Sequence, residues 1–186
     1  AFLNRVTARS SSPLRILDVG FGDGDMLRRI AHWAKARHQS VELVGIDLNP
    51  RSAEAAMTRT SARLPITYRT GDYADLAGEP WDVILSSLVA HHMTHDQLVT
   101  FLRFMDQHAK RGWFINDLHR HGFAYAGYPL LARICGWHRI VREDGALSIA
   151  RSYRPAEWPP LLAEANIQNA RVFRTFPFRL CVEAIR

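Results

Sequence analysis

Cysteine, lysine and long apolar runs are all scarce in this chain of 186 residues. The two cysteines, Cys135 and Cys181, lie far apart, and neither belongs to a CxxC pair, which argues against a disulfide framework and against a zinc site. We therefore expect small buried thiols and a reducing, cytoplasmic location. No stretch approaches the roughly 20 uninterrupted apolar residues that a membrane span requires, so we expect no membrane span.

Positive charge is present but thinly spread. The formal net charge is +6, and nearly all of the basic residues are arginines, because Lys35 and Lys110 are the only lysines. No basic run is longer than two residues. A nucleic-acid-binding surface normally concentrates such charge in a patch or stripe. The scatter favours an ordinary arginine-rich surface, and we expect no nucleic-acid partner.

Short apolar segments alternate regularly with amphipathic ones along the chain. The apolar segments read as strands and the amphipathic segments, with apolar residues every three to four positions, read as helices. The expected strands are residues 14–19, 41–46, 66–70, 81–86, 112–116, 171–176 and 179–185. The expected helices are residues 25–37, 50–63, 96–110 and 155–165. This alternation predicts right-handed crossovers and a doubly wound α/β fold.

The alternation is interrupted between residues 119 and 153. This segment is rich in aromatic residues and arginine, with one expected helix over residues 123–135. An insertion after the fifth strand would lie over the ligand crevice of a doubly wound sheet. We therefore expect one domain, residues 1–186, with a lid-like insertion at about 119–153.

The strongest chemical signal is a glycine-rich turn between the first strand and the first helix. Residues 18–24 read DVGFGDG, a D-x-G-x-G-x-G pattern that differs from the G-x-G-x-x-G of dinucleotide-binding folds. Glycine allows the unusual backbone angles of such a turn and a close approach by a ligand. The free amides at the start of the helix then face that ligand.

The DVGFGDG turn resembles the first motif of class I S-adenosylmethionine-dependent methyltransferases, and the resemblance covers nearly the whole chain. It implies a Rossmann-like fold with a mostly parallel, seven-stranded sheet and an antiparallel last strand. It also implies S-adenosylmethionine as the cofactor, with the glycine turn around its methionine part.

Two acidic residues follow the next two strands. Asp47 is about 20 residues past the glycine turn, where a carboxylate can accept hydrogen bonds from both ribose hydroxyls. Asp72 lies in a Thr-Gly-Asp-Tyr run, and in similar methyltransferases the acidic residue accepts from the adenine amino group while its neighbour, here Tyr73, lies against the ring. The alternatives are a helix-dipole partner for Asp47 and a turn cap for Asp72.

Histidines follow the fourth strand in the segment SSLVAHHMTHD, residues 86–96. Plant-type O-methyltransferases carry a Leu-His-Asp-Trp-Ser-Asp run here whose histidine is the general base. Matching that run makes His91 the base, although His92 stands where that family has Asp and Met93 where it has Trp. A structural turn histidine is the alternative. Neutral imidazole has a suitable pKa for removing a phenolic proton. His92 and His95 are expected to face solvent or to cap a helix.

The segment NDLHRH, residues 116–121, leaves the fifth strand. It is similar to an Asn-Asp-Leu-His-Arg element in bacterial quinone- and polyketide-type small-molecule methyltransferases. Its polar side chains would project toward the acceptor, which makes His119 a second candidate for the catalytic base. The alternative is an internal ion pair between Asp117 and Arg120 that ties down the lid.

Together these motifs predict methyl transfer from S-adenosylmethionine to a small aromatic or apolar acceptor, by O- or C-methylation. The alternatives are a nucleic-acid methyltransferase, although no Asn/Asp-Pro-Pro-Tyr motif follows the fourth strand, or a non-catalytic cofactor-binding relative. We expect no metal, because the histidines lack carboxylate and cysteine partners at metal-site spacing. The expected cofactor-binding residues are Asp18, Gly20, Phe21, Gly22, Gly24, Asp47, Leu48, Asp72, Tyr73 and Ser87.

Overall fold

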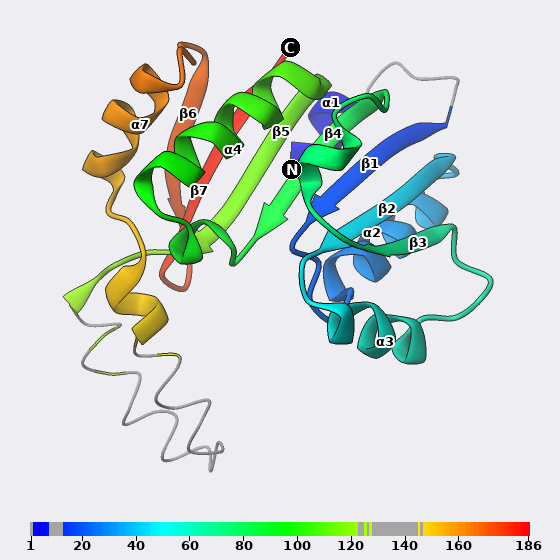
Figure 1. Cartoon of the computed structure of the whole chain (residues 1–186). Helices are drawn as coiled ribbons and strands as arrows, with labels where there is room; N and C mark the ends of the chain where they lie inside the picture. Colours follow the sequence, from blue (N-terminus) through cyan, green and yellow to red (C-terminus); the bar gives the residue numbers. More distant parts are fainter. Residues whose placement is uncertain (1, 8–12, 123–124, 126, 128–144, 146) are drawn as a thin grey trace.

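The fold is built on one seven-stranded sheet in the order β3-β2-β1-β4-β5-β7-β6 (Figure 1). The computed structural model describes residues 2–7, 13–122, 125, 127, 145 and 147–186. Strand β7 runs antiparallel to both of its neighbours, and the other strand pairs are parallel, which confirms the predicted sheet. The strands are β1 Leu14–Val19, β2 Val41–Asp47, β3 Ile66–Thr70, β4 Trp81–Ser87, β5 Ala109–Leu118, β6 Ala170–Thr175 and β7 Arg179–Ile185.

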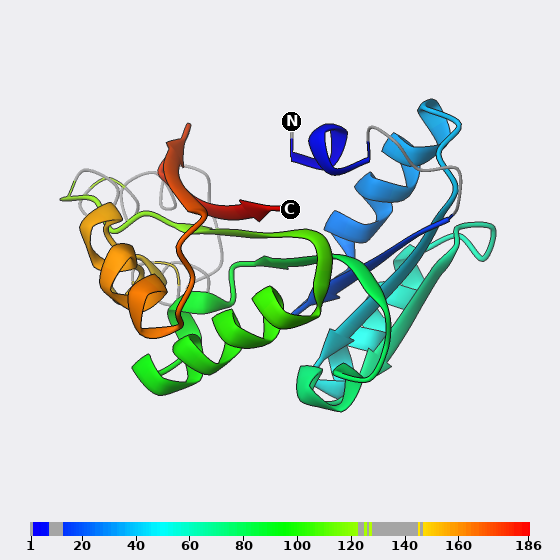
Figure 2. The ribbon, with the colours of Figure 1, turned by 90° about the horizontal axis from the view of Figure 1, so that it is seen from above.

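Helices cover both faces of the sheet (Figure 2). Residues of α1, α2 and α3 pack on one face, and residues of α4 and α7 pack on the other. The helices are α1 Phe2–Val6, α2 Asp25–Ala36, α3 Pro50–Arg59, α4 His95–His108 and α7 Trp158–Glu164. Single 3-10 turns are η1 Tyr73–Leu76, η2 Ala90–His92 and η3 Pro155–Glu157. The short helix α1 and the turns η1 and η2 were not expected from the sequence.

Local signals set where the helices begin. The side chain of Asn49 accepts a hydrogen bond from the Arg51 amide, and Pro50 occupies the first turn of α3. A reciprocal capping box between Thr94 and Gln97 starts α4 one residue earlier than predicted. At the other end, α4 stops at His108 and the chain enters β5 directly. The predicted helix end and strand start there were therefore off by a few residues.

The central strands are buried on both faces, which fixes the positions of their ends. Strand β1 and strand β4 each have a run of four consecutive buried residues, as expected for parallel strands between two helical layers. The two tryptophans Trp81 and Trp113 are fully buried in the core on the α4 and α7 side. The carboxyl ends of β1 to β5 all emerge at the same edge of the sheet. Any ligand at this edge is held on a rigid frame.

The predicted helix over residues 123–135 and most of the predicted lid at 119–153 lie outside the residues that the structure describes. Among the residues that the structure describes, no helix has both the length and the apolar character needed to cross a membrane.

Candidate functional site

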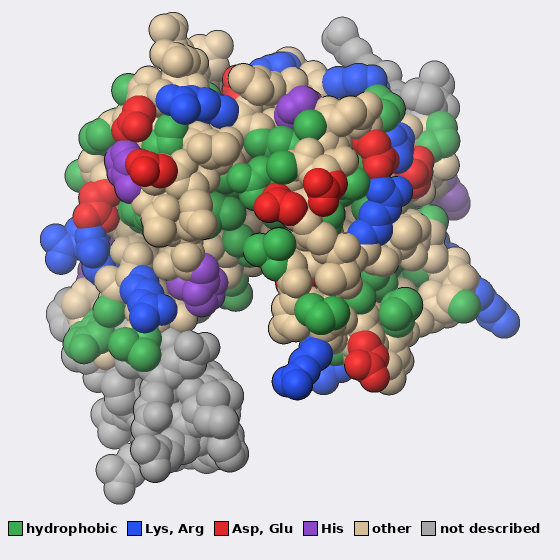
Figure 3. Space-filling view, in the orientation of Figure 1, with side chains coloured by type: hydrophobic (Ala, Val, Ile, Leu, Met, Phe, Trp, Pro, Cys, Tyr) green, Lys and Arg blue, Asp and Glu red, His purple; other side chains and the backbone are tan. Residues whose placement is uncertain are grey.

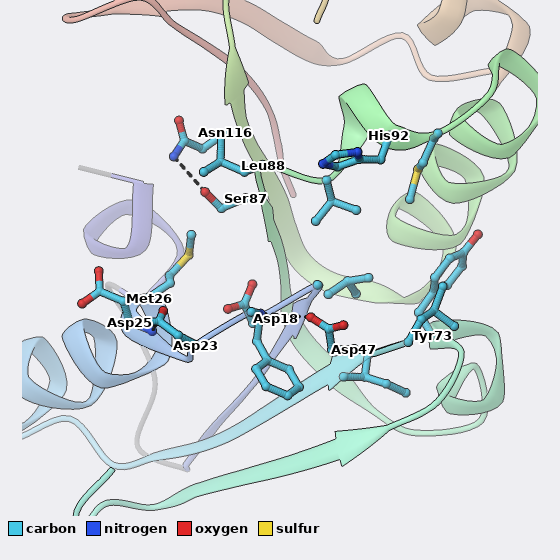
Figure 4. Close-up of a pocket in the computed structure, with 18 of the residues that line it drawn as sticks. Asp18, Asp23, Asp25, Met26, Asp47, Tyr73, Ser87, Leu88, His92 and Asn116 are labelled. Carbon is cyan, nitrogen blue, oxygen red and sulfur yellow. Dashed lines mark hydrogen bonds between the residues drawn. The ribbon is translucent and has the colours of Figure 1, made fainter. Parts of the chain in front are cut away.

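A pocket of about 860 Å³ opens at the carboxyl edge of the parallel strands. The space-filling view shows the surface notched at this edge (Figure 3). The wall of the pocket is formed by the segments after β1, β2, β3 and β4, by the first turn of α2, by the end of β5 and by the start of β7. The predicted residues Asp18, Gly20, Phe21, Gly22, Asp47, Leu48, Tyr73 and Ser87 all line it (Figure 4). Gly24 and Asp72 are not on the wall.

The glycine turn forms one side of the pocket with left-handed backbone angles. Gly20 has φ +74°, and a Cβ there would lie 2.3 Å from Val89 Cγ2. Gly24 has φ +77°, and a Cβ there would lie 2.4 Å from the Tyr68 hydroxyl, so its role is packing. Gly22 has φ +56°, but no heavy atom lies within 4 Å of its added Cβ. Gly22 thus leaves open space where a ligand can approach the backbone.

Asp18 is a buried carboxyl group on the pocket wall. Its exposed fraction is 1%, and its Oδ1 atom has no hydrogen-bond partner among the described residues. Burial raises the pKa of the Asp18 carboxyl to about 8, and the negative charge of Asp47 adds to the rise. An unpartnered buried carboxyl group is costly, and a positively charged ligand would offset this cost. The site therefore fits a cation.

Asp47 is held by the backbone at the end of β2. Its Oδ2 accepts from the Gly22 amide at 3.0 Å, and its Oδ1 accepts from the Asn49 amide at 2.9 Å. Each carboxylate oxygen has a second lone pair that can accept from a ligand hydroxyl. Next to it, Leu48 lines the pocket and is 75% exposed.

After β3, Gly71 and Tyr73 reach the pocket, whereas Asp72 caps η1. The Asp72 side chain accepts from the Ala74 amide at 2.9 Å and is exposed. The Tyr73 ring packs against Phe101 and Phe104, at centroid distances of 4.9 and 4.8 Å. Burial raises the pKa of Tyr73, and the charge of Asp72 contributes. The ring of Tyr73 is thus held in place at the pocket. Asp72 forms the turn cap that the sequence analysis gave as the alternative to adenine binding.

The turn η2 after β4 places His92, not His91, on the pocket wall. His92 and Met93 line the pocket, and Figure 4 shows the His92 ring at its upper side. His91 is buried, and its Nδ1 lies 2.6 Å from Asp117 Oδ1. The His91 amide also donates to Asp117 Oδ2, at 2.9 Å. His91 is therefore locked behind the wall, with its ring 4.0 Å from that of His92.

Strand β5 sends alternate side chains to opposite faces at this edge. Asn116 lines the pocket and donates from Nδ2 to Ser87 Oγ at 3.1 Å, as Figure 4 shows. Asp117 points the other way, to His91. The ion pair between Asp117 and Arg120, which the sequence left open as an alternative, does not form, because Arg120 pairs with Glu157 instead.

His119 does not line the pocket. It is buried, and its ring lies 5.3 Å from the ring of His121. Burial lowers the pKa of His119, and the charges of His121, Arg174 and Arg154 lower it further. The neutral form of the His119 ring is therefore favoured, but this side chain is not part of the pocket wall.

Sequence reasoning missed several residues of the wall. Met26 and Asp25 come from the first turn of α2, and Met93 follows η2. Arg179, the first residue of β7, also lines the pocket, and its Nη1 is buried without a hydrogen-bond partner among the described residues. No local motif marks Arg179, because only the pairing of β7 with β5 brings it to this edge. Among the described residues, no cluster of three or more metal-ligating side chains is found.

A family model described as "Methyltransferase domain" matches residues 16–112, which is more than half of the chain. This range runs from the glycine turn to the start of β5 and contains both η1 and η2. No curated protein sequence matches the chain.

Several of the solved structures similar to this chain are methyltransferases. The plantazolicin methyltransferase BpumL, in complex with a triazolic desmethylPZN analog and SAH, is 16% identical, with a TM-score of 0.72 over 100% of this chain and 80% of that one. An S-adenosylmethionine-dependent methyltransferase from Aquifex aeolicus is 18% identical, with a TM-score of 0.69 over 99% and 87%. The magnesium protoporphyrin IX methyltransferase from Synechocystis PCC 6803, with bound SAH, is 18% identical, with a TM-score of 0.64 over 100% and 80%. The chain therefore belongs to the methyltransferase domain family, and the resemblance to class I S-adenosylmethionine-dependent methyltransferases is confirmed.

Proposed function

We propose that this protein transfers the methyl group of S-adenosylmethionine to a small aromatic or apolar acceptor, by O- or C-methylation. The observation that carries the proposal is the unpartnered, buried Oδ1 atom of Asp18 in a pocket that also contains the glycine turn and Asp47. A nucleoside ligand with a positive charge matches this set of groups. The sulfonium and ammonium groups of S-adenosylmethionine supply that charge.

Each predicted cofactor residue on the wall has a group suited to one part of the cofactor. Asp18 would hold positive charge near the methionine part, and the open side of Gly22 would allow its close approach. Asp47, already fixed by two backbone amides, would accept from the ribose hydroxyls. The Tyr73 ring and the exposed Leu48 would enclose the adenine. The bound cofactor supplies a methyl carbon on a positively charged sulfur atom.

The other half of the wall supports an apolar acceptor. Leu88, Val89 and Met93 line it after β4, with Asn116 and Ser87 as the polar groups beside them. Methyl transfer from sulfur is a direct displacement, so alignment and exclusion of water supply most of the rate. An apolar wall serves both. The similar structures include methyltransferases described as acting on plantazolicin and magnesium protoporphyrin IX, which favours the same substrate class.

A base on this wall would assist transfer to a hydroxyl group. Among the described residues, His92 is the histidine that lines the pocket, so we propose that it takes the proton from the hydroxyl group of the acceptor. His91, one of the two predicted bases, acts as a positioning residue: its bond to Asp117 fixes η2, and its ring supports His92. His119, the other predicted base, lies off the pocket wall, and its catalytic role stays a prediction.

The test combines cofactor binding with turnover. Calorimetry should show binding of S-adenosylhomocysteine to the purified chain, and Asp47→Ala should weaken that binding. A methyl-donor assay across small phenols and quinone precursors should then identify an acceptor. Failure of the chain to bind S-adenosylhomocysteine at millimolar concentration would overturn the proposal. Binding without turnover on any acceptor would favour the non-catalytic alternative.

A further inference from the structure

Arg179 is a pocket residue in which one guanidinium nitrogen lacks a hydrogen-bond partner among the described residues. It is the first residue of β7 and pairs with Leu118 of β5 on one side and Thr175 of β6 on the other. This position, between two strands, fixes its backbone. Its Nη1 atom is buried and has no hydrogen-bond partner among the described residues, and the side chain lines the pocket.

Several other arginines near the sheet are paired with carboxylates. Arg15 pairs with Glu42 and Glu79, and Arg111 pairs with Asp82. On β7 itself, the buried Glu183 takes two arginines, Arg5 and Arg171. A guanidinium nitrogen that is buried without an acceptor is costly, and such groups in native proteins usually have a ligand or water as partner. Arg179 differs from these arginines because no described carboxylate forms an ion pair with it.

The charges of the pocket are separated along its length. All the acidic side chains of its described wall come from β1, the turn after it, the start of α2 and β2, and they are Asp18, Asp23, Asp25 and Asp47. Arg29 lines the same end and pairs with Asp25. The residues that β4, η2, β5 and β7 contribute include no acidic side chain among those described. An anionic ligand group therefore meets no carboxylate from the described residues at the second end, where Arg179 lies.

We propose that Arg179 binds an anionic group of the acceptor, a carboxylate, and so selects anionic over neutral acceptors. The inference rests on the proposed function, because it assigns the acidic end of the pocket to the cofactor and this end to the acceptor. A guanidinium group can form two parallel hydrogen bonds to a carboxylate, which gives both affinity and orientation. The acceptor is then an apolar or aromatic molecule that carries a carboxylate. Arg179 holds it from the strand next to β5, opposite the cofactor end.

The experiment compares two probes of nearly the same shape, benzoate and benzamide, by NMR titration of the S-adenosylhomocysteine-saturated chain. We expect benzoate to bind at least 10-fold more tightly than benzamide. Arg179→Gln should abolish this difference, and Arg179→Lys should keep part of it because the charge remains without the bidentate geometry. The matched control is Arg174→Gln on β6, which removes the same charge from an exposed residue off the pocket wall and should keep the full difference.

Several results would overturn the proposal. Equal affinity of the wild-type chain for the two probes, including no binding of either, is one. Retention of the difference in Arg179→Gln is another. A fall in S-adenosylhomocysteine affinity in Arg179→Gln, with the probe difference kept, would assign Arg179 to the cofactor carboxylate instead. Thermal melting of each variant verifies folding. If the wild-type chain bound no S-adenosylhomocysteine but still preferred benzoate in its absence, the proposed function would fail and the anion site would stand.

Discussion

The two ends of the pocket are built in different ways. At the cofactor end, the contacts come from short turns that follow β1 and β2, and backbone amides of these turns hold Asp47 in place. At the acceptor end, the wall consists of side chains from β4, η2, β5 and β7. The first end is fixed by backbone geometry close in sequence, and the second by strand pairing between distant segments. We therefore expect the cofactor end to tolerate little local change, and the proposed acceptor end to change specificity one side chain at a time.

The largest expected effect is at Gly20, where the two ends touch. Gly20→Ala places a Cβ 2.3 Å from Val89 Cγ2 and forces an alanine to φ +74°. We expect S-adenosylhomocysteine affinity to fall more than 100-fold and the free energy of unfolding to fall by about 2 to 4 kcal/mol. Calorimetry and denaturant melts measure the two effects.

Gly22→Ala is the matched control for this prediction. Its added Cβ meets open space, so only the φ of +56° costs stability, about 1 to 2 kcal/mol. The fold should therefore be less damaged than in Gly20→Ala, while ligand approach is still blocked. Equal stability of the two variants would contradict the close packing of Val89 against Gly20.

The next largest effect tests the acceptor end. His92→Ala should lower turnover on a hydroxyl acceptor by about 100-fold or more, because loss of a general base costs that much. Cofactor affinity should change less than twofold. Asp117→Asn, which weakens the support of η2 through His91, should lower turnover by a smaller factor and leave the pH profile in place. The base assignment fails if His92→Ala keeps full turnover while Asp117→Asn loses it.

Asp18 tests the cofactor end by its charge. Asp18→Asn should weaken binding of S-adenosylmethionine by about 10- to 100-fold, because the substitution removes the buried carboxylate that would pair with the cationic ligand. In the wild-type chain, burial raises the pKa of Asp18 to about 8, so binding of the cation must release a proton below that pH. Affinity should therefore rise between pH 6 and 9. Calorimetry in buffers of different ionisation enthalpy measures the released proton.

The same pKa shift has the opposite consequence for stability. The folded chain binds the Asp18 proton more tightly than the unfolded chain, so this group favours folding below its ordinary pKa of 3.8, and its contribution is lost as the pH rises to about 8. Asp18→Asn should therefore stabilise the empty protein at pH 9 by about 2 to 5 kcal/mol. A variant that melts earlier than the wild-type chain at pH 9 would contradict the burial of an unpartnered carboxyl group.

The sequence predicted the residues of the cofactor end of the pocket better than those of the acceptor end. The glycine turn and Asp47 are local motifs, and the structure places both on the wall. At the acceptor end, the sequence favoured His91, but a 3-10 turn rotates His92 into the pocket and Asp117 captures His91. That contact joins residues 26 positions apart. Periodicity cannot predict such a contact, because it depends on how η2 packs against β5.

Strand positions were predicted well for a similar reason. The expected segments 14–19 and 179–185 match β1 and β7, since each strand contains a run of at least four buried residues that is short and mostly apolar. The register of β7 on β5 has no such local signal. Arg179 reaches the pocket only through that register. A residue of this kind therefore becomes a candidate only when the structure is known.

We expect the smallest effect from a substitution of Asp72. This substitution distinguishes two roles for Asp72, a cap of η1 and an acceptor for the adenine amino group. As a cap of η1, the Asp72 side chain contributes about 1 kcal/mol to folding, and Asp72→Asn keeps most of this because asparagine caps well. Since Asp72 lies off the wall while Tyr73 lines it, we expect cofactor affinity to change threefold or less in Asp72→Asn. If Asp72 instead accepts from the adenine amino group, the asparagine should lose about 10-fold, because a charged acceptor is replaced by a neutral one. Calorimetry with S-adenosylhomocysteine distinguishes these outcomes, and Asp75→Asn, an exposed neighbour in η1, serves as the control for the loss of one negative charge.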